Sequence, residues 1–185
     1  RVKSMPALLG EADLVKTLQQ LPGVAVGTEG MTGLYVRGGG ADENLYLLDG
    51  NPVYHVNHLL GFFSAFNPDA IKNTRFYKGS FPAEYGGRLS SVVDVRMNDG
   101  NQQEYHGNIS VGLLSARANL EGPIIKDRSS FNVSVRRTWL DLITGTALAI
   151  VNKNSDTKES FGYHFFDINA KVNHSFSERS RAYLS

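Results

Sequence analysis

The sequence predicts an α+β domain, with a small mixed sheet and short helices, followed by a set of antiparallel β-strands. Two observations carry this prediction. Residues 1–100 combine short helical and strand-like runs with frequent glycine turns, and the whole chain holds 19 glycines among 185 residues. From about Gln102 onward, apolar and polar residues alternate strictly, which is the period of a β-strand with one apolar face.

Three short helices are expected in the first half. In the first, Leu14, Leu18 and Leu21 are spaced i, i+4 and i+7, so they form one apolar stripe that ends at Pro22-Gly23. The second covers residues 57–66, with Asn57 as its cap. The third covers residues 69–72, because Asn67-Pro68 places a cap residue before a proline. The predicted strands of this half are 24–26, 33–37, 45–48, 74–78 and 91–97.

Four runs in the second half alternate in period two. They cover residues 105–113, 115–121, 131–136 and 166–173. Short turns are expected over 122–129 and 177–180, and a long connection over 138–163. Strands of about 10 residues with short turns on one side and longer loops on the other are typical of a transmembrane β-barrel. A soluble β-meander with one face on a core has the same period, so both interpretations stay open.

Composition excludes several classes of protein. The formal net charge is +1, from 19 basic and 18 acidic side chains, which argues against a general nucleic-acid binder. The chain has no cysteine, so it has neither disulfides nor thiolate metal sites. No apolar run approaches the ~18 residues of a membrane helix. Four or five strands cannot close a barrel, and open edges are not tolerated in lipid. We therefore expect either a piece of a longer protein or a protein outside the membrane.

Two groups of motifs resemble those of one family. The first is Leu34-Tyr35-Val36-Arg37-Gly38-Gly39-Gly40 followed by Leu47-Leu48-Asp49-Gly50-Asn51-Pro52-Val53. The second is Asn67-Pro68-Asp69-Ala70-Ile71, then Lys78-Gly79 and, six residues after that glycine, Tyr85-Gly86. In this order and spacing they are similar to the plug domain of TonB-dependent outer-membrane receptors. The resemblance runs from about residue 5 to residue 97. It continues into Glu121-Gly122-Pro123-Ile124, which looks like the first periplasmic turn.

The resemblance implies a plug over residues 1–100 and the first four to five strands of a transmembrane β-barrel over residues 101–185. Such a barrel has about 22 strands and a plugged lumen. The implied function is active import of a scarce solute across the outer membrane, with the plug gating the lumen. The implied partners are the TonB energy-coupling protein, whose box would lie upstream, the solute, and outer-membrane lipid. A soluble periplasmic α/β binding module with an appended β-meander is the alternative.

The match is closest to the Bacteroidetes-like type and lacks features of the glycan-importing subgroup. One departure concerns an Arg-Ile-Glu triplet that many members carry before the second motif. Here Asn73-Thr74-Arg75 stands in its place. The ion pairs between plug and barrel that this triplet often makes are therefore not expected at Asn73 and Arg75.

The resemblance also assigns a set of plug turns and plug–barrel contacts. Arg37 is expected to form a buried ion pair or hydrogen bond that locks plug to barrel, rather than a solvated charge. Asp49-Gly50 is expected to build a turn in which the Asp side chain accepts hydrogen bonds from local backbone N–H groups. A calcium site there would need more carboxylates. The whole set is Arg37, Gly38, Asp49, Gly50, Gly79, Gly86 and Arg88.

A second set is expected to face the imported ligand. The segment 54–63 would form the outward apex of the plug, and a second apical loop would carry weaker candidates. The set is Tyr54, His55, His58, Phe62, Phe63, Phe81, Glu84 and Tyr85. His55 and His58 have a spacing that suits a metal on a helix, but a polar loop is the preferred interpretation. Iron chelates, haem, cobalamin, oligosaccharides and peptides all remain open as solutes.

No pattern predicts catalysis, a resident cofactor or a metal. The glycines at 38–40 are not followed by Lys-Ser/Thr and lack the G-x-G-x-x-G spacing, so they predict a turn rather than a phosphate loop. Serine and histidine occur without a nucleophile elbow or a credible triad order. The sequence therefore predicts a binding and transport protein, not an enzyme.

Overall fold

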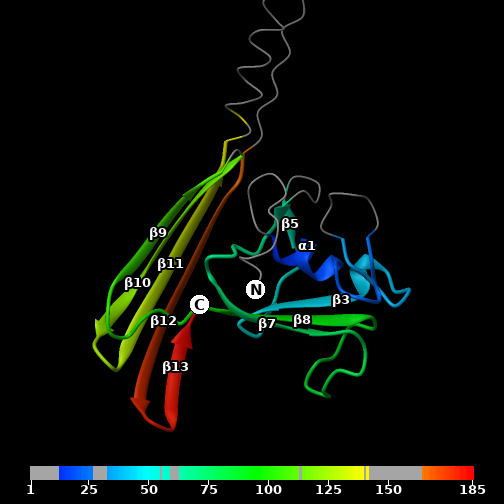
Figure 1. The fold of residues 1–185 in the computed structure, drawn as a ribbon. Coiled ribbons are helices and arrows are strands. Elements are labelled where there is room, and N and C mark those ends of the chain that lie inside the picture. Colours follow the sequence, from blue (N-terminus) through cyan, green and yellow to red (C-terminus); the bar gives the residue numbers. More distant parts are fainter. Residues whose placement is uncertain are drawn as a thin grey trace, which may run out of the picture.

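A computed structural model of the chain describes residues 13–26, 33–54, 56–58, 63–112, 114–139, 141 and 164–185. These residues form two bodies that stand side by side (Figure 1). The N-terminal unit holds one α-helix and several short sheets, and the C-terminal sheet has five antiparallel strands. Within these ranges no helix is both long and apolar enough to cross a membrane.

The first helix forms as predicted but is shorter. Helix α1 covers Leu14–Gln19, and its N-cap Asp13 accepts hydrogen bonds from the backbone N–H groups of Val15 and Lys16. It buries Leu14, Val15 and Leu18 against the core. The helix ends before Pro22-Gly23, where Gly23 takes a φ of 79° that favours glycine.

A four-stranded mixed sheet organises the N-terminal unit. Its strands are β3 (Asn44–Leu48), β4 (Asn51–Pro52), β7 (Ile71–Tyr77) and β8 (Ser91–Met97), in the order β4-β3-β8-β7. Strand β3 runs parallel to β8, while the other two pairs are antiparallel. One face of the sheet carries Tyr46, Val93 and Val95 into a core shared with α1. Two smaller elements complete the unit: the 3-10 helix η2 (Ala41–Glu43), and the pair β1 (Val24–Ala25) and β2 (Tyr35–Val36).

The helix predicted over residues 57–66 is wrong where the structure describes it. Strand β5 (Asn57–His58) pairs antiparallel with β6 (Phe63–Ser64) instead. Phe66, which was expected on the helix face, is buried in the sheet core, with its ring 6.2 Å from that of Tyr46. Tertiary burial of this aromatic ring therefore outweighs the helical spacing of the local apolar residues.

The helix predicted over residues 69–72 is also absent. A turn replaces it: the backbone N–H of Asp69 donates to Asn67 Oδ1, and that of Ala70 donates to the Asn67 carbonyl. Ile71 then begins β7 and pairs with Met97 of β8. Asn67-Pro68 thus starts a turn, a role that suits this dipeptide as well as helix capping does.

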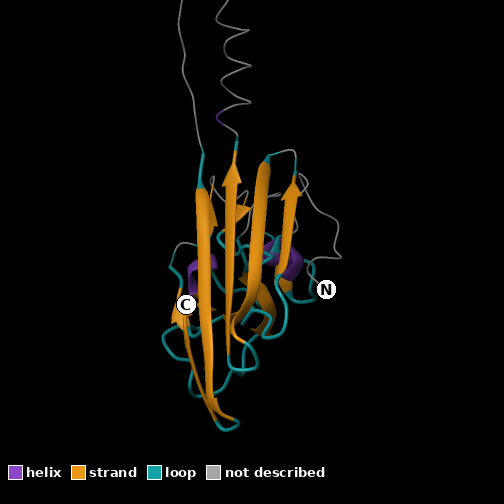
Figure 2. Cartoon of the chain, turned by 90° about the vertical axis from the view of Figure 1, so that its left-hand side faces the viewer, coloured by secondary structure: helices purple, strands orange, loops and turns teal. Residues whose placement is uncertain are grey.

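The C-terminal sheet confirms the period-two segments. Its strands are β9 (His106–Val111), β10 (Ser115–Ile125), β11 (Ser129–Thr138), β12 (Phe166–Ser177) and β13 (Ser180–Leu184), each paired with the next along the chain. Figure 2 views this sheet face-on, with the N-terminal unit behind it. The expected turn over 122–129 is narrower than predicted, because β10 continues through Pro123 to Ile125 with a register shift between them. The predicted long connection over 138–163 lies mostly outside the described residues.

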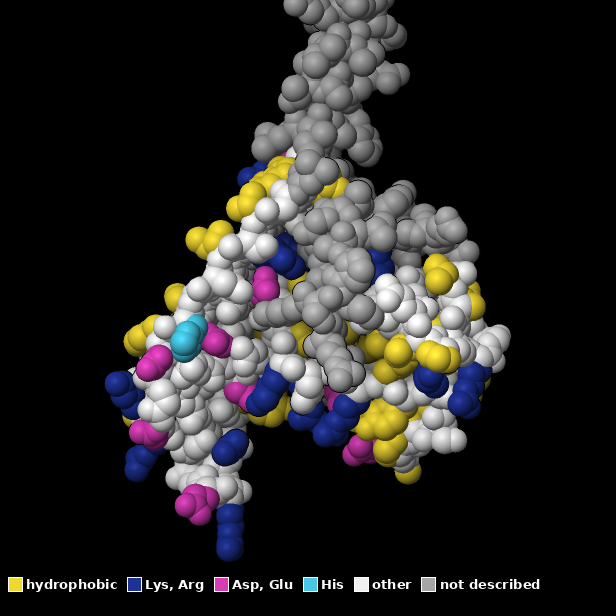
Figure 3. All heavy atoms as spheres, viewed as in Figure 1, with side chains coloured by type: hydrophobic (Ala, Val, Ile, Leu, Met, Phe, Trp, Pro, Cys, Tyr) yellow, Lys and Arg dark blue, Asp and Glu magenta, His cyan; other side chains and the backbone are white. Residues whose placement is uncertain are grey.

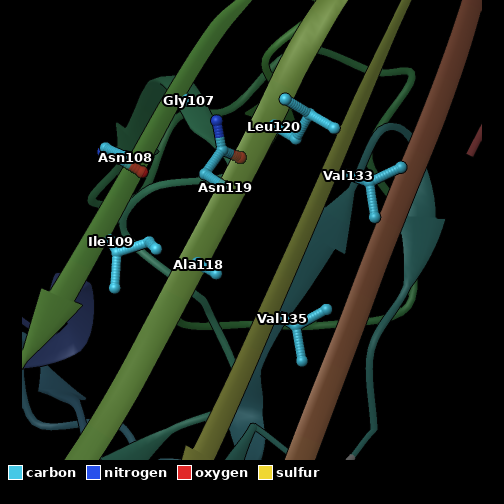
Figure 4. Close-up of a pocket in the computed structure, with 8 residues that line it drawn as sticks. All are labelled: Gly107, Asn108, Ile109, Ala118, Asn119, Leu120, Val133 and Val135. Carbon is cyan, nitrogen blue, oxygen red and sulfur yellow. The ribbon is translucent and has the colours of Figure 1, made fainter.

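Burial in the C-terminal sheet is inverted relative to a soluble protein. Ile109 is 81% exposed and Ile168 62%, whereas Ser130, Asn132 and Ser134 on the opposite face are fully buried. Figure 3 shows the apolar side chains along the outer side of this sheet. On that side Ile109, Leu120, Val133 and Val135 surround a shallow apolar hollow of about 520 Å³ (Figure 4). The sheet therefore turns its apolar face outward and its polar face toward the N-terminal unit.

The connection between the two bodies depends on Gly100. Its φ is 85°, and a Cβ there would lie 2.2 Å from the Phe131 carbonyl oxygen. Gly50 has the same φ of 85°, but a Cβ there would meet no atom within 4 Å.

We expect Gly100→Ala to destabilise the full-length protein by at least about 2 kcal/mol more than Gly50→Ala. The control substitution carries only the backbone strain of a positive φ, about 1–2 kcal/mol. The measurement is the free energy of unfolding of both variants. Equal losses would show that Gly100 does not make the close approach described.

Candidate functional site

The candidate site is the polar interface, which we define as the contacts between the N-terminal unit and the inner face of the C-terminal sheet. Its side chains come from two sources. The polar faces of β10, β11 and β12 contribute residues from the sheet, and the chain around Asp49, residues 64–69 and residues 97–99 contributes from the unit. Three groups of contacts make up this interface.

The first group centres on Lys171 of β12, whose side chain is 4% exposed. Its Nζ lies 3.2 Å from Asp49 Oδ1 and 2.9 Å from Asp99 Oδ1, and it donates to the Met97 carbonyl at 3.3 Å. The ammonium also lies 4.6 Å from the centre of the Tyr183 ring. One buried cation thus joins two carboxylates of the N-terminal unit to the sheet.

Asp49 and Asp99 are held from several directions. Asp49 Oδ1 also accepts the backbone N–H of Met97 at 3.0 Å. Asp99 forms a second ion pair with Lys72 at 2.5 Å. Burial alone would raise the pKa of Asp99, but the hydrogen bonds and positive charges of Lys72 and Lys171 hold it below its ordinary value of 3.8.

The second group centres on Arg136 of β11, whose side chain is 1% exposed. Its Nε and one terminal nitrogen donate to Asp167 Oδ2 at 2.8 and 2.6 Å, across the β11–β12 pair. The same nitrogen donates to the Ser64 carbonyl at 2.7 Å. The Ser64 N–H donates in turn to Asp13 Oδ2 at 2.7 Å, and Asp13 caps α1. A continuous series of hydrogen bonds therefore runs from the sheet to the first helix.

The third group joins residues 67–69 and 98 to the sheet. Arg117 Nε lies 3.4 Å from Asp69 Oδ2, and Asn67 Nδ2 donates to Ser134 Oγ at 3.3 Å. Glu121 Oε2 accepts from Asn98 at 2.5 Å and from Asn132 at 3.2 Å. Buried polar groups are stable only when they are partnered in this way.

A comparison with known protein families identifies the N-terminal unit. The family model described as TonB-dependent Receptor Plug Domain matches residues 4–93. Residues 4–93 belong to the plug-domain family of TonB-dependent receptors. The N-terminal unit is the plug, the C-terminal sheet is the start of the barrel wall, and the polar interface lies between them. Membership places the protein in the outer membrane, as predicted, and the family is one of receptors and transporters, not an enzyme class.

Two solved structures have a similar fold. The siderophore receptor PirA from Acinetobacter baumannii is 20% identical, with a TM-score of 0.61. The ferric enterobactin receptor PfeA from Pseudomonas aeruginosa, a mutant form, is 21% identical with the same TM-score. Each comparison covers 92% of this chain, which spans only 28% and 29% of those two receptors. No curated protein sequence matches the chain.

The predicted lock residues have different positions in the structure. Asp49 lies in the polar interface and takes the expected turn, with a φ of 50°, but its Oδ1 bonds Met97 and Lys171 rather than local N–H groups. Arg37 and Arg88 are exposed, and among the described residues Arg37 has no ion-pair partner. Its guanidinium lies beside Gly79. A locking role for Arg37 stays a prediction.

The predicted glycines mark turns of the plug. Gly38, Gly50 and Gly79 have φ values of 83°, 85° and 88°, which explains their residue type. At the Tyr85-Gly86-Gly87 turn the positive φ falls on Gly87 rather than Gly86. Because glycine has no side chain, these positions serve the turns of the plug rather than polar contacts with the wall.

The predicted ligand residues divide into two places. Tyr54 is 78% exposed and precedes β5. His55 and Phe62 lie outside the described residues; His58 and Phe63 lie in β5 and β6. The loop 78–90, which carries Phe81, Glu84 and Tyr85, lies beneath the plug sheet, on the side opposite β5 (Figure 1). A shared outward apex for the two loops is therefore at odds with the structure.

Most residues of the polar interface were missed in the sequence. The strands that carry Arg117, Arg136 and Lys171 were correctly predicted, and all three residues lie on the polar faces of those strands. A charged residue on a lumen-facing position was therefore the signal that could have identified these contacts. Asp69 was visible only as part of a family motif. In the described part of the chain, no group of three or more His, Asp or Glu side chains is placed to hold a metal ion.

We expect Lys171→Met to destabilise the receptor by about 3–5 kcal/mol, because Asp49 and Asp99 lose their buried cation. The loosened plug should also admit large antibiotics such as vancomycin. Unfolding free energy and antibiotic susceptibility are the measurements. Lys126→Met, in the exposed turn after β10, is the matched control, with an expected change within about 0.5 kcal/mol. Equal behaviour of the two variants would show that Lys171 does not hold the plug against the wall.

Acid should weaken the same contacts through Asp99. Its pKa is lower in the folded state than the ordinary value of 3.8, so its stabilisation is complete above that value and is lost as the pH falls through the lowered pKa. The measurement is the unfolding temperature of wild type and Asp99→Asn from about pH 6 down to about pH 3. The advantage of the wild type should shrink in acid, and a constant difference would contradict this assignment.

Proposed function

We propose that the whole receptor imports a scarce solute across the outer membrane, with TonB as the source of energy and the plug as the gate. Residues 1–100 act as the plug, and residues 101–185 are the first strands of the wall. The observation that carries the proposal is the polar interface. It fixes the plug to the wall through contacts that can break and re-form without any covalent change.

The inverted burial of the C-terminal sheet favours this function over a soluble periplasmic module. A soluble protein rarely exposes a large contiguous apolar patch. Here the outward face of five neighbouring strands is largely apolar, whereas the inner face is polar and is covered by the plug on β10, β11 and β12. That arrangement suits a wall with lipid outside and a polar lumen inside.

The names of the two similar receptors make ferric siderophores the first solutes to test. Both proteins are named for siderophores or ferric enterobactin. Haem, cobalamin, oligosaccharides and peptides are the solutes to test next. The Bacteroidetes-like subgroup stays a prediction.

The ligand contacts of the plug are proposed to lie on the segment around β5 and β6. Strands β11 and β12 border the long connection 139–165, and short turns close the opposite end of the sheet. Because longer loops are extracellular in such barrels, that end faces outward. Strand β5 lies toward it (Figure 1). Tyr54, His58 and Phe63 are therefore the preferred contacts, together with His55 and Phe62.

The test is uptake of a panel of radiolabelled ferric siderophores by cells that carry the full-length gene or its deletion. We expect uptake that stops when the proton gradient is dissipated or when tonB is deleted. Tyr54→Ala with His58→Ala should weaken solute binding at least about tenfold. Phe81→Ala, on the opposite side of the sheet, is the control and should bind normally.

Two results would contradict the proposal. Recovery of the full-length protein in the soluble fraction would favour the periplasmic module. Growth of the deletion strain on every limiting solute of the panel, including haem and cobalamin, as fast as the parent would exclude import of these solutes.

A further inference from the structure

A second site lies at the end of the wall that carries the short turns. It is a pocket of about 280 Å³ between the turn at 126–128 and the hairpin of β12 and β13. Arg128, Ser175 and Arg181 line it, together with Gln102 from the connection between the plug and the wall. None of these four residues takes part in the three groups of contacts of the polar interface.

The two arginines and the serine stand on neighbouring segments of the sheet. The Ser175 backbone N–H donates to the Arg128 carbonyl at 2.8 Å, and Ser175 is opposite Arg181 in the β12–β13 register. Because neighbouring strands lie about 4.8 Å apart, the backbones of the two arginines are about 10 Å apart. Two long arginine side chains can therefore close on one small ligand between them, with the serine hydroxyl at its centre.

This row lies on the inner side of the wall. Tyr183, two residues after Arg181, donates its hydroxyl to a carbonyl of the plug at 3.4 Å. Ser130, two residues after Arg128, donates its hydroxyl to another plug carbonyl at 2.7 Å. Because side chains two residues apart on a strand share a face, both arginines belong to the plug side of the sheet. Lipid headgroups would meet the opposite side.

The pocket carries positive charge that is not neutralised. Both guanidinium groups are exposed, and within the described ranges neither has an ion pair or a side-chain hydrogen bond. Of the two carboxylates that line the pocket, that of Asp127 accepts a hydrogen bond from Gln103, and Glu178 stands in the second turn. Residues 126–128 and 178–181 together hold four basic and two acidic side chains, a net charge of +2. Figure 3 shows basic side chains gathered at this end of the wall.

These features select an oxyanion as the ligand. The planar guanidinium group presents paired N–H donors that match two oxygens of a carboxylate or phosphate. The Ser175 hydroxyl adds a further donor, whereas a metal ion or an amine would meet the net positive charge. Phe176 also borders the pocket, with 69% of its surface exposed, and offers an apolar surface to the carbon skeleton of an organic anion.

We propose that Arg128, Ser175 and Arg181 form a binding site for the carboxylate or phosphate group of a small molecule at the periplasmic mouth of the lumen. The periplasmic placement rests on the proposed function, because the short turns of outer-membrane barrels face the periplasm. Two sources supply this chemistry: an anionic solute that leaves the lumen, and a free anion of the periplasm.

The test is isothermal titration calorimetry on the full-length receptor in detergent, with inorganic phosphate and citrate as the probes. We expect Arg128→Gln and Arg181→Gln each to weaken binding of the tighter probe at least about tenfold, because a charged donor pair is lost. Lys126→Gln is the matched control. It removes the same charge from the turn that carries Arg128, but it does not line the pocket, so the affinity should change less than about twofold.

Two further observations exclude a folding defect or a general effect of charge. The arginines are exposed, so the variants should keep the unfolding temperature of the wild type. Arg181→Lys keeps the charge but loses the paired donors, and its affinity should fall between those of the wild type and Arg181→Gln. The site is overturned if the wild type binds neither probe, if both arginine variants bind as tightly as the wild type, or if Lys126→Gln causes an equal loss.

A competition experiment distinguishes the two sources. Displacement of citrate by the solute that the cells import, lost in Arg181→Gln, would assign the site to the departing solute. Binding of the probes without such competition would assign it to a free anion. The test also separates this site from the proposed function. If cells import no solute of the panel, yet the probes bind the wild type and not the arginine variants, the function fails and the anion site stands.

The opposite result is equally informative. If import proceeds with TonB as proposed, while phosphate and citrate bind the arginine variants and the wild type alike, only the anion site is overturned.

Discussion

Burying charged side chains between the plug and the wall costs desolvation free energy, and the arrangement is stable only because these charges are paired with one another. Lys171 illustrates the constraint most clearly. Its ammonium group is withdrawn from water and lies between Asp49 and Asp99, which belong to a different body of the molecule. Arg136 is paired with Asp167 of its own sheet and reaches the N-terminal unit through the Ser64 carbonyl. The inverted pattern of the wall follows, since its inner face must be polar to receive these groups.

An interface of this kind suits a gate better than an apolar core would. Its hydrogen bonds and ion pairs can be exchanged for bonds to water when the plug moves, so opening does not expose a large apolar surface. The same contacts are directional and therefore fix the plug in one position when it is at rest. The hydrogen bonds from Arg136 through Ser64 to Asp13 attach the start of α1 to the wall.

The sequence predicted the features that depend on local pattern. Period two located the strands of the wall, the leucine stripe located α1, and the glycine turns with their motifs predicted the plug. It failed where distant groups decide the outcome. The burial of Phe66 against Tyr46 replaced a predicted helix with a hairpin. The main partner of Asp49 lies 122 positions further along the chain, a distance at which a single sequence carries no pairing signal.

We expect the plug to separate from the wall when solute passes. The most direct test is a reversible cross-link across the polar interface, in a chain that has no cysteine in these 185 residues. Asn67 and Ser134 contact each other across it through short side chains. A receptor with Asn67→Cys and Ser134→Cys should, when oxidised, bind its solute normally but import none, and import should return on reduction. Either single-cysteine variant should be unaffected. Import at the wild-type rate by the fully cross-linked receptor would contradict the account.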